Sequence, residues 1–408
     1  MSTDFPNSEK INEMAQGALQ FTSSIIDKHG PRISGSQSCL DSAETIKEFF
    51  SKSCDTVNTD EYRLKPKAFM GFIRVIFLSY ILQIIFVLLR IPIISGFFGF
   101  YVILVILFEY IFYYQFTDIL PIWSIKDGKN VWGVVEPLDT VNNVVVLSGH
   151  HDSTPIFNFY EQEDNVYFLR EIIAFVTSIL YSIWNIILPF TNIGSPKVYL
   201  ITAIIGIIGV RFLYPLWFFL NEKGTPGAGD NLISVAVSHE VAKYFHNNKL
   251  KNTRVIVASF DSEESGLRGS RVFWEKHARE LNQYNCYNIN GDCIYYHDEL
   301  RIVTRDINLT TKMDENLVNK CGQIATELGF KRIIEPIPLM AGGCDSGEAA
   351  RHGIKATTIL SIPFTNKFRR TVYHTREDVV SEIEPKAVEQ VIAIMTKFCQ
   401  DLDSGKFK

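Results

Sequence analysis

Four long apolar stretches, arranged as two pairs, constrain most strongly what this chain can fold into. The first pair covers residues 69–89 and 91–116, and the second covers residues 172–190 and 198–220. Each stretch is close to the ~20 residues that a helix needs to cross a ~30 Å hydrocarbon layer. The linker within each pair is too short for anything but a tight hairpin. The sequence therefore predicts four transmembrane helices, inserted as two hairpins.

The alternative is that these stretches form buried hairpins in a soluble core or in an oligomer interface. Arg74, Glu109 and Arg211 favour this alternative, because charged side chains are costly inside a bilayer. Against it, segment 172–190 has almost no polar face, whereas a helix on the surface of a soluble core has one. The chain is also 47% apolar and only 21% charged, which favours a membrane part.

Lysine and arginine residues near the helix ends predict the orientation in the bilayer. The hairpin tips offer only Arg90 and Lys197. The cationic residues on the side that carries the rest of the chain are Arg63, Lys65, Lys67, Arg74, Lys126, Lys129, Arg170 and Lys223. We therefore expect the polar part of the chain to face the cytoplasm.

The polar part of the chain alternates between helical and strand-like patterns. Helices are expected within residues 7–53 and at 234–245, 313–328 and 384–402. Strands are expected at 131–135, 144–147, 255–260 and 357–362. This alternation predicts an α/β fold with a mainly parallel central sheet flanked by helices.

Charge, cysteine content and the N-terminus narrow the function further. Lys and Arg total 40 against 45 Asp and Glu, a net charge of −5, so we expect no nucleic-acid partner. The seven cysteines are scattered without C-x-x-C spacing, which predicts neither a disulfide framework nor a thiolate zinc site. The first residues lack the pattern of a secretory signal, so we expect a cytosolic start.

Metal-binding residue types follow several expected strands, where open α/β sheets gather functional groups. They are His150 and Asp152 after the strand at 144–147, Glu263 and Glu264 after the strand at 255–260, Asp292 after a short strand-like segment, Asp230 before a helix, and His374 after the last strand. Two histidines with several carboxylates and no thiolate form a ligand set suited to zinc. One carboxylate could bridge two ions about 3.5–4 Å apart.

The adjacent glutamates suggest a division of labour. In an extended segment Glu263 and Glu264 would point opposite ways, so that one could bind metal while the other acts as a general base. Asp152, two residues after His150, could orient that imidazole. Taken singly, each residue also has a structural interpretation, and Asp230 could merely cap a helix. Taken together and in order, the set favours a metal centre.

Six motifs occur in order along the polar part of the chain. They are G-H-H-D-S (149–153), G-A-G-D-N (227–231), F-D-S-E-E-S-G-L-R-G-S (260–270), I-N-G-D (289–292), C-D-S-G-E-A-A-R-H-G-I-K-A (344–356) and Y-H-T-R-E-D (373–378). In these motifs the chain resembles the co-catalytic zinc aminopeptidase family, which also contains glutamate carboxypeptidases and glutaminyl cyclases. The E-E-x-G-L-x-G-S and Y-H-T-x-x-D elements are the specific ones.

The resemblance implies a zinc-peptidase fold that holds two zinc ions. The ligands would be His150, Asp230 and Asp292 for one ion, and Asp230, Glu264 and His374 for the other, with Asp230 as the bridge. Glu263 would be the general base, and Asp152 would orient His150. Asp345 and Tyr373 would contribute to the substrate pocket. Asp292 is preferred to Asp345 as a ligand because the family's ligand follows an I-N-x-D strand.

The chain also departs from the family pattern. The family usually has Ser-Gly after Asp-Asn, where this chain has Ile233 and Ser234, and the middle residue of H-x-D is His151. His150 and Asp230 are much further apart in sequence than in related enzymes, and the second hairpin accounts for the excess. We therefore expect the membrane part to be inserted into the catalytic domain. The expected bounds are 1–65, 121–165 and 222–408 for the catalytic domain, 66–120 for hairpin 1 and 166–221 for hairpin 2.

The sequence as a whole predicts a membrane-embedded zinc aminopeptidase that acts on peptides, with a homo-oligomer left open. A carboxypeptidase would need a cation for the substrate carboxylate, and Arg351, Arg369 and Arg370 are candidates. The full two-metal ligand set argues against a one-metal glutaminyl cyclase. A catalytically inactive membrane scaffold would be free to lose ligands, and none is missing.

Overall fold

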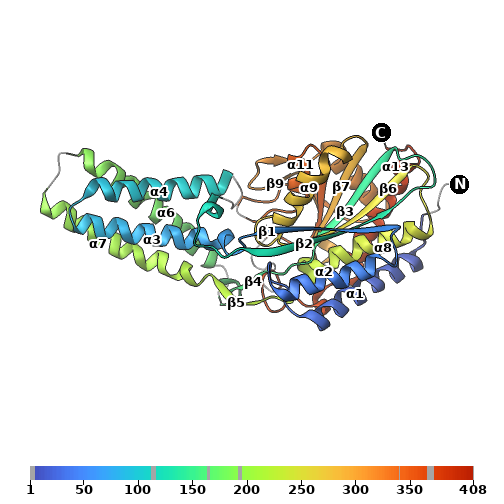
Figure 1. Ribbon diagram of the computed structural model, residues 1–408, viewed down its shortest axis with the longest axis horizontal. Coiled ribbons are helices and arrows are strands. Elements are labelled where there is room, and N and C mark those ends of the chain that lie inside the picture. The colour runs from blue at the N-terminus through green and yellow to red at the C-terminus, as the bar shows by residue number, and fades with distance from the viewer. Residues whose placement is uncertain are drawn as a thin grey trace. The chain divides into compact units, whose positions relative to one another are not determined.

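The computed structural model describes residues 5–111, 116–162, 166–191, 195–339, 341–364 and 372–407, and it forms two compact units (Figure 1). Unit 1 comprises Met1–Leu64, Ile125–Ile156 and Lys223–Lys408. Unit 2 comprises Lys65–Ser124 and Phe157–Glu222. The chain thus leaves unit 1 twice and returns to it twice.

Unit 1 is built on an eight-stranded sheet with the strand order β1-β2-β6-β3-β7-β12-β8-β11. Its four central strands are β6 (Thr253–Phe260), β3 (Asn143–His150), β7 (Asn285–Ile294) and β12 (Lys355–Ser361), each parallel to its neighbours in this group. In β3 the run Val144 to Leu147 is fully buried, as in strands covered on both faces. The expected parallel α/β sheet is therefore present at the centre of the unit.

The sheet becomes mixed toward its edges. On one side β2 (Lys126–Val135) runs antiparallel to β6, and β1 (Thr56–Leu64) runs antiparallel to β2. On the other side β8 (Leu300–Val303) is antiparallel to β12, and β11 (Ile333–Glu335) is parallel to β8. Two small sheets pair β9 (Arg305–Asp306) with β10 (Thr311–Lys312), and β4 (Pro155–Phe157) with β5 (Leu220–Gly224).

Helices pack on the sheet of unit 1 from both sides. One layer contains α1 (Ser8–His29), α8 (Ile233–Asn247) and α13 (Pro385–Asp403), which contact one another, and α10 (Glu315–Glu327), which packs on α13. The helix α2 (Gln37–Phe50) packs on α1, β1 and β2. The helices α9 (Arg268–Leu281) and α11 (Ser346–Arg351) contact each other, and Figure 1 shows them above β1 and β2 with α1 and α2 below.

The ends of several helices follow directly from sequence. Asn7 accepts a hydrogen bond from the Lys10 N–H at the start of α1 (2.9 Å), and Asp314 accepts one from the Leu317 N–H at the start of α10 (2.8 Å). Asn and Asp at this position satisfy N–H groups that have no partner within the helix. The helices α8, α10 and α13 lie within about three residues of the bounds expected from the sequence.

Unit 2 contains four long helices, α3 (Ala68–Leu88), α4 (Pro92–Ile111), α6 (Val166–Ile187) and α7 (Pro196–Leu213), and a short helix α5 (Asn158–Gln162). The helix α3 packs against α4 and α7, and α6 packs against the same two. Four candidate spans in these helices are long and apolar enough to cross a membrane: Ala68–Leu88, Pro92–Glu109, Leu169–Phe190 and Pro196–Phe218. Most of each expected apolar stretch is therefore helical within the described residues, with the length and composition of a membrane span.

Polar side chains gather inside the bundle of unit 2. Gln83, Ser95, Ser182 and Asn185 have no exposed surface. The Ser95 hydroxyl lies 2.6 Å from Asn185 Oδ1, and Gln83 Nε2 donates to Ser182 Oγ at 3.2 Å. The exposed side chains of these helices include Ile93, Phe97, Leu180, Leu200 and Ile208. These polar side chains lie among buried apolar ones such as Phe72 and Ile76, and the exposed surface is also apolar, unlike that of a soluble bundle.

Small residues bring the helices of unit 2 close together. A Cβ at Gly99 of α4 would lie 2.7 Å from the Ser182 carbonyl oxygen of α6, and one at Gly96 would lie 2.9 Å from the Asn185 carbonyl oxygen. Such close contacts between backbones are common where membrane helices associate.

Candidate metal centre

The five expected ligands and the expected general base, Glu263, lie together at the carboxyl ends of the central strands of unit 1. His150 is the last residue of β3, Asp292 lies near the end of β7, and the two glutamates follow β6. The remaining two are Asp230, in the turn before α8, and His374, in the loop after β12. All six side chains are buried. Residues as far apart as 150 and 374 are therefore neighbours in the fold.

The carboxylate of Asp230 lies between the two histidines. Its Oδ1 is 3.3 Å from His150 Nε2, and its Oδ2 is 3.2 Å from His374 Nε2. Glu263 Oε2 lies 3.6 Å from His150 Nε2, and Glu264 Oε2 lies 3.4 Å from His374 Nε2. The cluster thus has two halves, each with one histidine and one glutamate, which share Asp230.

Asp292 belongs to the same cluster. Ligand atoms of His150, Glu263 and Asp292 all lie within 4.8 Å of one another, as do those of His150, Asp230 and Glu264. A third such group joins Asp230 and Asp292 with Cys293. Cys293 was not among the residues predicted to bind metal, because the seven cysteines lack the spacing of a thiolate zinc site; its signal in the sequence is its place directly after Asp292. The seven cysteines all lie in the described part of the chain and form no disulfide there.

The cluster fits divalent cations. His150 Nε2, Asp230 Oδ2 and Glu264 Oε1 are buried and make no hydrogen bond within the described residues. Burial raises the pKa of Glu263 and Glu264, and neighbouring carboxylates such as Asp292 raise it further. Crowded buried carboxylates favour the binding of positive charge. Imidazole nitrogens and carboxylate oxygens are zinc ligands.

Asp152 organises both His150 and the turn after β6. Its Oδ1 lies 3.3 Å from His150 Nδ1, which is the contact expected from the sequence. The same carboxylate accepts the backbone N–H groups of Glu263 (3.1 Å) and Glu264 (3.2 Å), and the hydroxyl of Ser34 (2.8 Å).

The expectation that the two glutamates lie in an extended segment was wrong. They lie in a turn between β6 and α9. Because one carboxylate, that of Asp152, binds both of their N–H groups, the chain curls there, and both glutamate side chains face the metal centre.

The two expected substrate residues lie in or beside the cluster. Asp345 is fully buried, and the side chain of Ser270 is the hydrogen-bonding group beside its carboxylate. Burial raises the pKa of Asp345 to about 7, and the negative charge of Asp292 contributes. The ring of Tyr373 stacks on that of His374, with centroids 3.7 Å apart.

Other residues singled out in the sequence have structural partners. His151 Nδ1 contacts Ser259 Oγ at 2.8 Å in the interior, and Arg351 pairs with Glu348 at 3.2 Å. Ser234, where the family pattern differs, packs under Gly149, at which a Cβ would lie 2.7 Å from the Ser234 Cβ. Arg369 and Arg370 lie outside the described residues.

Asp378, which was not among the predicted site residues, holds the turn that carries Asp230. Asp378 Oδ1 accepts the N–H groups of Ala228 (3.1 Å) and Gly229 (2.7 Å) and the hydroxyl of Tyr295 (2.8 Å). The signal was present, because Asp378 is the final residue of the Y-H-T-R-E-D motif.

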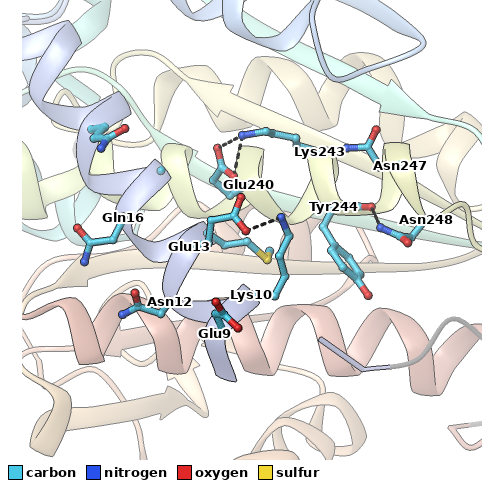
Figure 2. A pocket seen from close by; sticks show the side chains of 13 residues that line it. Glu9, Lys10, Asn12, Glu13, Gln16, Glu240, Lys243, Tyr244, Asn247 and Asn248 are labelled. Carbon is cyan, nitrogen blue, oxygen red and sulfur yellow. Dashed lines mark hydrogen bonds and ion pairs between the residues drawn. The ribbon is translucent and has the colours of Figure 1, made fainter. Parts of the chain in front are cut away.

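A separate groove of about 710 Å³ lies between α1 and α8 (Figure 2). Two ion pairs occupy its walls, Lys10 with Glu13 and Lys243 with Glu240, each at 2.9 Å. None of the expected site residues lines this groove. The groove is therefore separate from the candidate metal centre.

Residues 210–399 match the sequence model of peptidase family M28. The chain contains a peptidase family M28 domain. The match includes Asp230, both glutamates, Asp292 and His374, whereas His150 precedes it. A search of curated proteins found no match.

Solved structures share the fold of the M28 domain. A glutaminyl cyclase from Fimbriiglobus ruber has a TM-score of 0.56 at 15% identity, covering 95% of this chain and 94% of that one. A zinc aminopeptidase from Bacillus subtilis has a TM-score of 0.56 at 13% identity, with coverages of 96% and 95%. A Zn-dependent exopeptidase from Parabacteroides distasonis also has a TM-score of 0.56 at 13% identity, with coverages of 98% and 100%. At these identities the likeness concerns the fold.

Proposed function

We propose that this chain is a membrane-embedded aminopeptidase that uses two zinc ions to remove N-terminal residues from peptides. The observation that carries the proposal is the position of Asp230, whose two carboxylate oxygens face different histidines at 3.2 and 3.3 Å. A carboxylate in this position suits a bridge between two ions. The M28 domain and its likeness in fold to a zinc aminopeptidase support the same reaction class.

The side chains divide into ligands and groups that handle protons. The ligands would be His150, Asp230 and Asp292 for one ion, and Asp230, Glu264 and His374 for the other. Bound zinc would supply Lewis acidity, which activates water and stabilises negative charge on the carbonyl oxygen. Glu263 would take a proton from the attacking water and give it to the leaving amine. Asp152 would keep Glu263 in place through the hydrogen bond to its backbone N–H.

The charge of the site favours an amine over a carboxylate as the recognised end of the peptide. Asp345 is a fully buried acid, and it lies close enough to Glu263 to raise the pKa of that residue. A positively charged N-terminus would compensate this carboxyl group. A carboxypeptidase would instead need a free cation; of the three candidates, Arg351 is already paired with Glu348, and Arg369 and Arg370 lie outside the described residues.

A glutaminyl cyclase is the second candidate, because a cyclase is among the structures that share the fold. The reactions differ in product: a cyclase releases ammonia from an N-terminal glutamine, whereas an aminopeptidase hydrolyses the first peptide bond. The complete second half of the cluster, Glu264 and His374 around Asp230, favours the two-metal peptidase.

The central experiment measures turnover and zinc content of the full chain purified in detergent. Substrates are peptides with free, acetylated and glutaminyl N-termini, and the variants are Glu263→Gln and, as a matched control on the surface of α9, Glu275→Gln. We expect cleavage of free N-termini only, about two zinc ions per chain, and a ~10²–10⁴-fold loss of rate in Glu263→Gln with zinc retained. Ammonia release without cleavage would establish the cyclase. Absence of bound zinc would overturn the proposal.

The membrane part of the proposal rests on unit 2, where buried polar and exposed apolar side chains lie on four helices of sufficient length. We further propose that the hairpin tips face away from the cytoplasm. Lys197→Cys at a tip and Lys223→Cys beyond the end of α7 test this orientation in intact cells. A membrane-impermeant maleimide should label the cysteine at 197 alone. Labelling at 223 alone would reverse the orientation.

A further inference from the structure

Arg32 is a fully buried cation that binds four main-chain carbonyl groups. Its Nε donates to the carbonyl oxygen of His151 at 2.7 Å, and Nη2 donates to that of Gly227 at 2.8 Å. Its Nη1 donates to the carbonyl oxygens of Pro226 (2.9 Å) and Gly30 (3.0 Å). Four of the five N–H groups of the guanidinium are thus used.

Three of these carbonyls belong to the two segments that carry the ligands His150 and Asp230, and the fourth, that of Gly30, lies at the end of α1. His151 directly follows His150, and Pro226 and Gly227 begin the turn that carries Asp230. The planar fork of one side chain therefore joins segments from opposite ends of the second membrane hairpin.

The neighbouring contacts make this connection stiff. Ser153 Oγ accepts the Arg32 N–H at 2.9 Å, and the Ser153 N–H donates to the Arg32 carbonyl at 3.0 Å. Gly227 has a φ of 66°, and a Cβ there would lie 2.8 Å from Arg32 Nη2, so only glycine fits against the fork.

The Asp230 turn is also held from the other direction. Asp378 binds the N–H groups of Ala228 and Gly229, while Arg32 binds the carbonyls of the two residues before them. A cation on the carbonyls and an anion on the N–H groups leave this segment little freedom. Within the described residues, the guanidinium of Arg32 donates only to main-chain carbonyls. Its hydrogen bonds therefore fix the position of the backbone, whereas a carboxylate partner would form a buried ion pair.

We propose that Arg32 is a positioning residue of the metal centre, whose guanidinium holds the His150 and Asp230 segments at the separation at which both can bind one ion. This inference rests on the proposed function only in taking His150 and Asp230 as ligands. Lysine would keep the charge but has a single ammonium group in place of the planar fork. The role therefore requires the shape of arginine as well as its charge.

The test compares Arg32→Met, Arg32→Lys and a control, Arg254→Met. Arg254 is a mostly buried arginine that pairs with Glu136 at the start of β6, about 20 Å from the other end of that strand. One readout is zinc affinity, measured by competition with a chromophoric chelator. The second is hydrogen exchange of amides 151–154 and 227–230 in zinc-free protein, which does not depend on catalysis.

We expect Arg32→Met to bind zinc ~10–100-fold more weakly, as when partners of metal ligands are removed. Both amide segments should exchange faster, Arg32→Lys should be intermediate, and Arg254→Met should match the wild type in both readouts even if its melting temperature falls. Wild-type affinity and exchange in Arg32→Met would overturn the inference. If that variant does not fold, wild-type behaviour of Arg32→Lys has the same meaning. A wild type that binds no zinc would overturn the proposed function. The exchange experiment would still test whether Arg32 holds the two segments in place.

Discussion

His239 should make the stability of unit 1 depend on pH. This histidine is only 5% exposed and lies in α8, where its ring stacks on Phe50 at 5.6 Å and contacts Phe21 at 5.4 Å. Its Nε2 lies 2.7 Å from Ser53 Oγ. Burial lowers the pKa of His239 from 6.5 to about 4, and the charge of Lys243 contributes.

The sign and size of the effect follow from this shift. Between pH 6.5 and 4 the unfolded chain binds a proton at His239 that the folded chain does not, so stability falls as the pH falls. From pH 7.5 to 5.0 the loss amounts to about 2 kcal/mol for a shift of this size. Glu240, 3.8 Å from His239 Nδ1, has a raised pKa and acts in the opposite direction. The comparison therefore keeps Glu240 in both proteins.

The assay is urea unfolding of wild type and His239→Phe in detergent, followed by pulse proteolysis at pH 7.5 and 5.0. Phenylalanine suits the aromatic surroundings and does not titrate. We expect the free energy of unfolding to fall by about 2 kcal/mol less in His239→Phe than in the wild type over this range. An equal loss in both proteins would refute the reasoning. Repeating the comparison in a Glu240→Gln background separates the two titrations.

Three further predictions concern the metal and the close contacts. Chelation of zinc should lower the melting temperature, because an ion present at 1,000 times its Kd stabilises the fold by about 4 kcal/mol; an unchanged calorimetric transition would contradict this. Gly99→Leu should lower the melting temperature in detergent through a clash with the Ser182 carbonyl, whereas Phe97→Leu on the exposed surface should not. Gly229→Ala places a Cβ 2.2 Å from the Tyr295 ring, so we expect a loss of about 1–3 kcal/mol in urea unfolding and weaker zinc binding, and wild-type values would count against this packing.

The centre of the sheet could be predicted from the sequence because its strands are short apolar runs, as in Val144 to Leu147. The strand β1 could not be predicted from the sequence. Its residues Thr56–Leu64 include Asp60, Glu61 and Arg63, and among the described strands it pairs with β2 alone, at the edge of the sheet. Polar residues are common in such strands because one edge faces solvent. An edge strand therefore carries a weaker pattern than a central one.

Part of the candidate site could also be predicted from the sequence, and part could not. His150, Asp292 and the glutamates could be placed together because the carboxyl ends of parallel strands share one edge of a sheet. The turn after β6 could not be foreseen, since it depends on hydrogen bonds to Asp152, more than a hundred residues earlier in the chain. Arg32 gave no signal either, because it binds backbone carbonyls, and these depend on tertiary structure rather than on residue type.

The two insertions in unit 1 have a consequence for the order of events during synthesis. Leu64 at the end of β1 pairs with Lys126 at the start of β2, so β1 emerges from the ribosome well before its only neighbour. At about 5–20 residues per second the delay is on the order of several seconds. Asp230 likewise appears only after α6 and α7 have been made. If the helices insert as the proposed function requires, the sheet and the metal centre close after insertion, and insertion becomes a checkpoint for the assembly of an active enzyme.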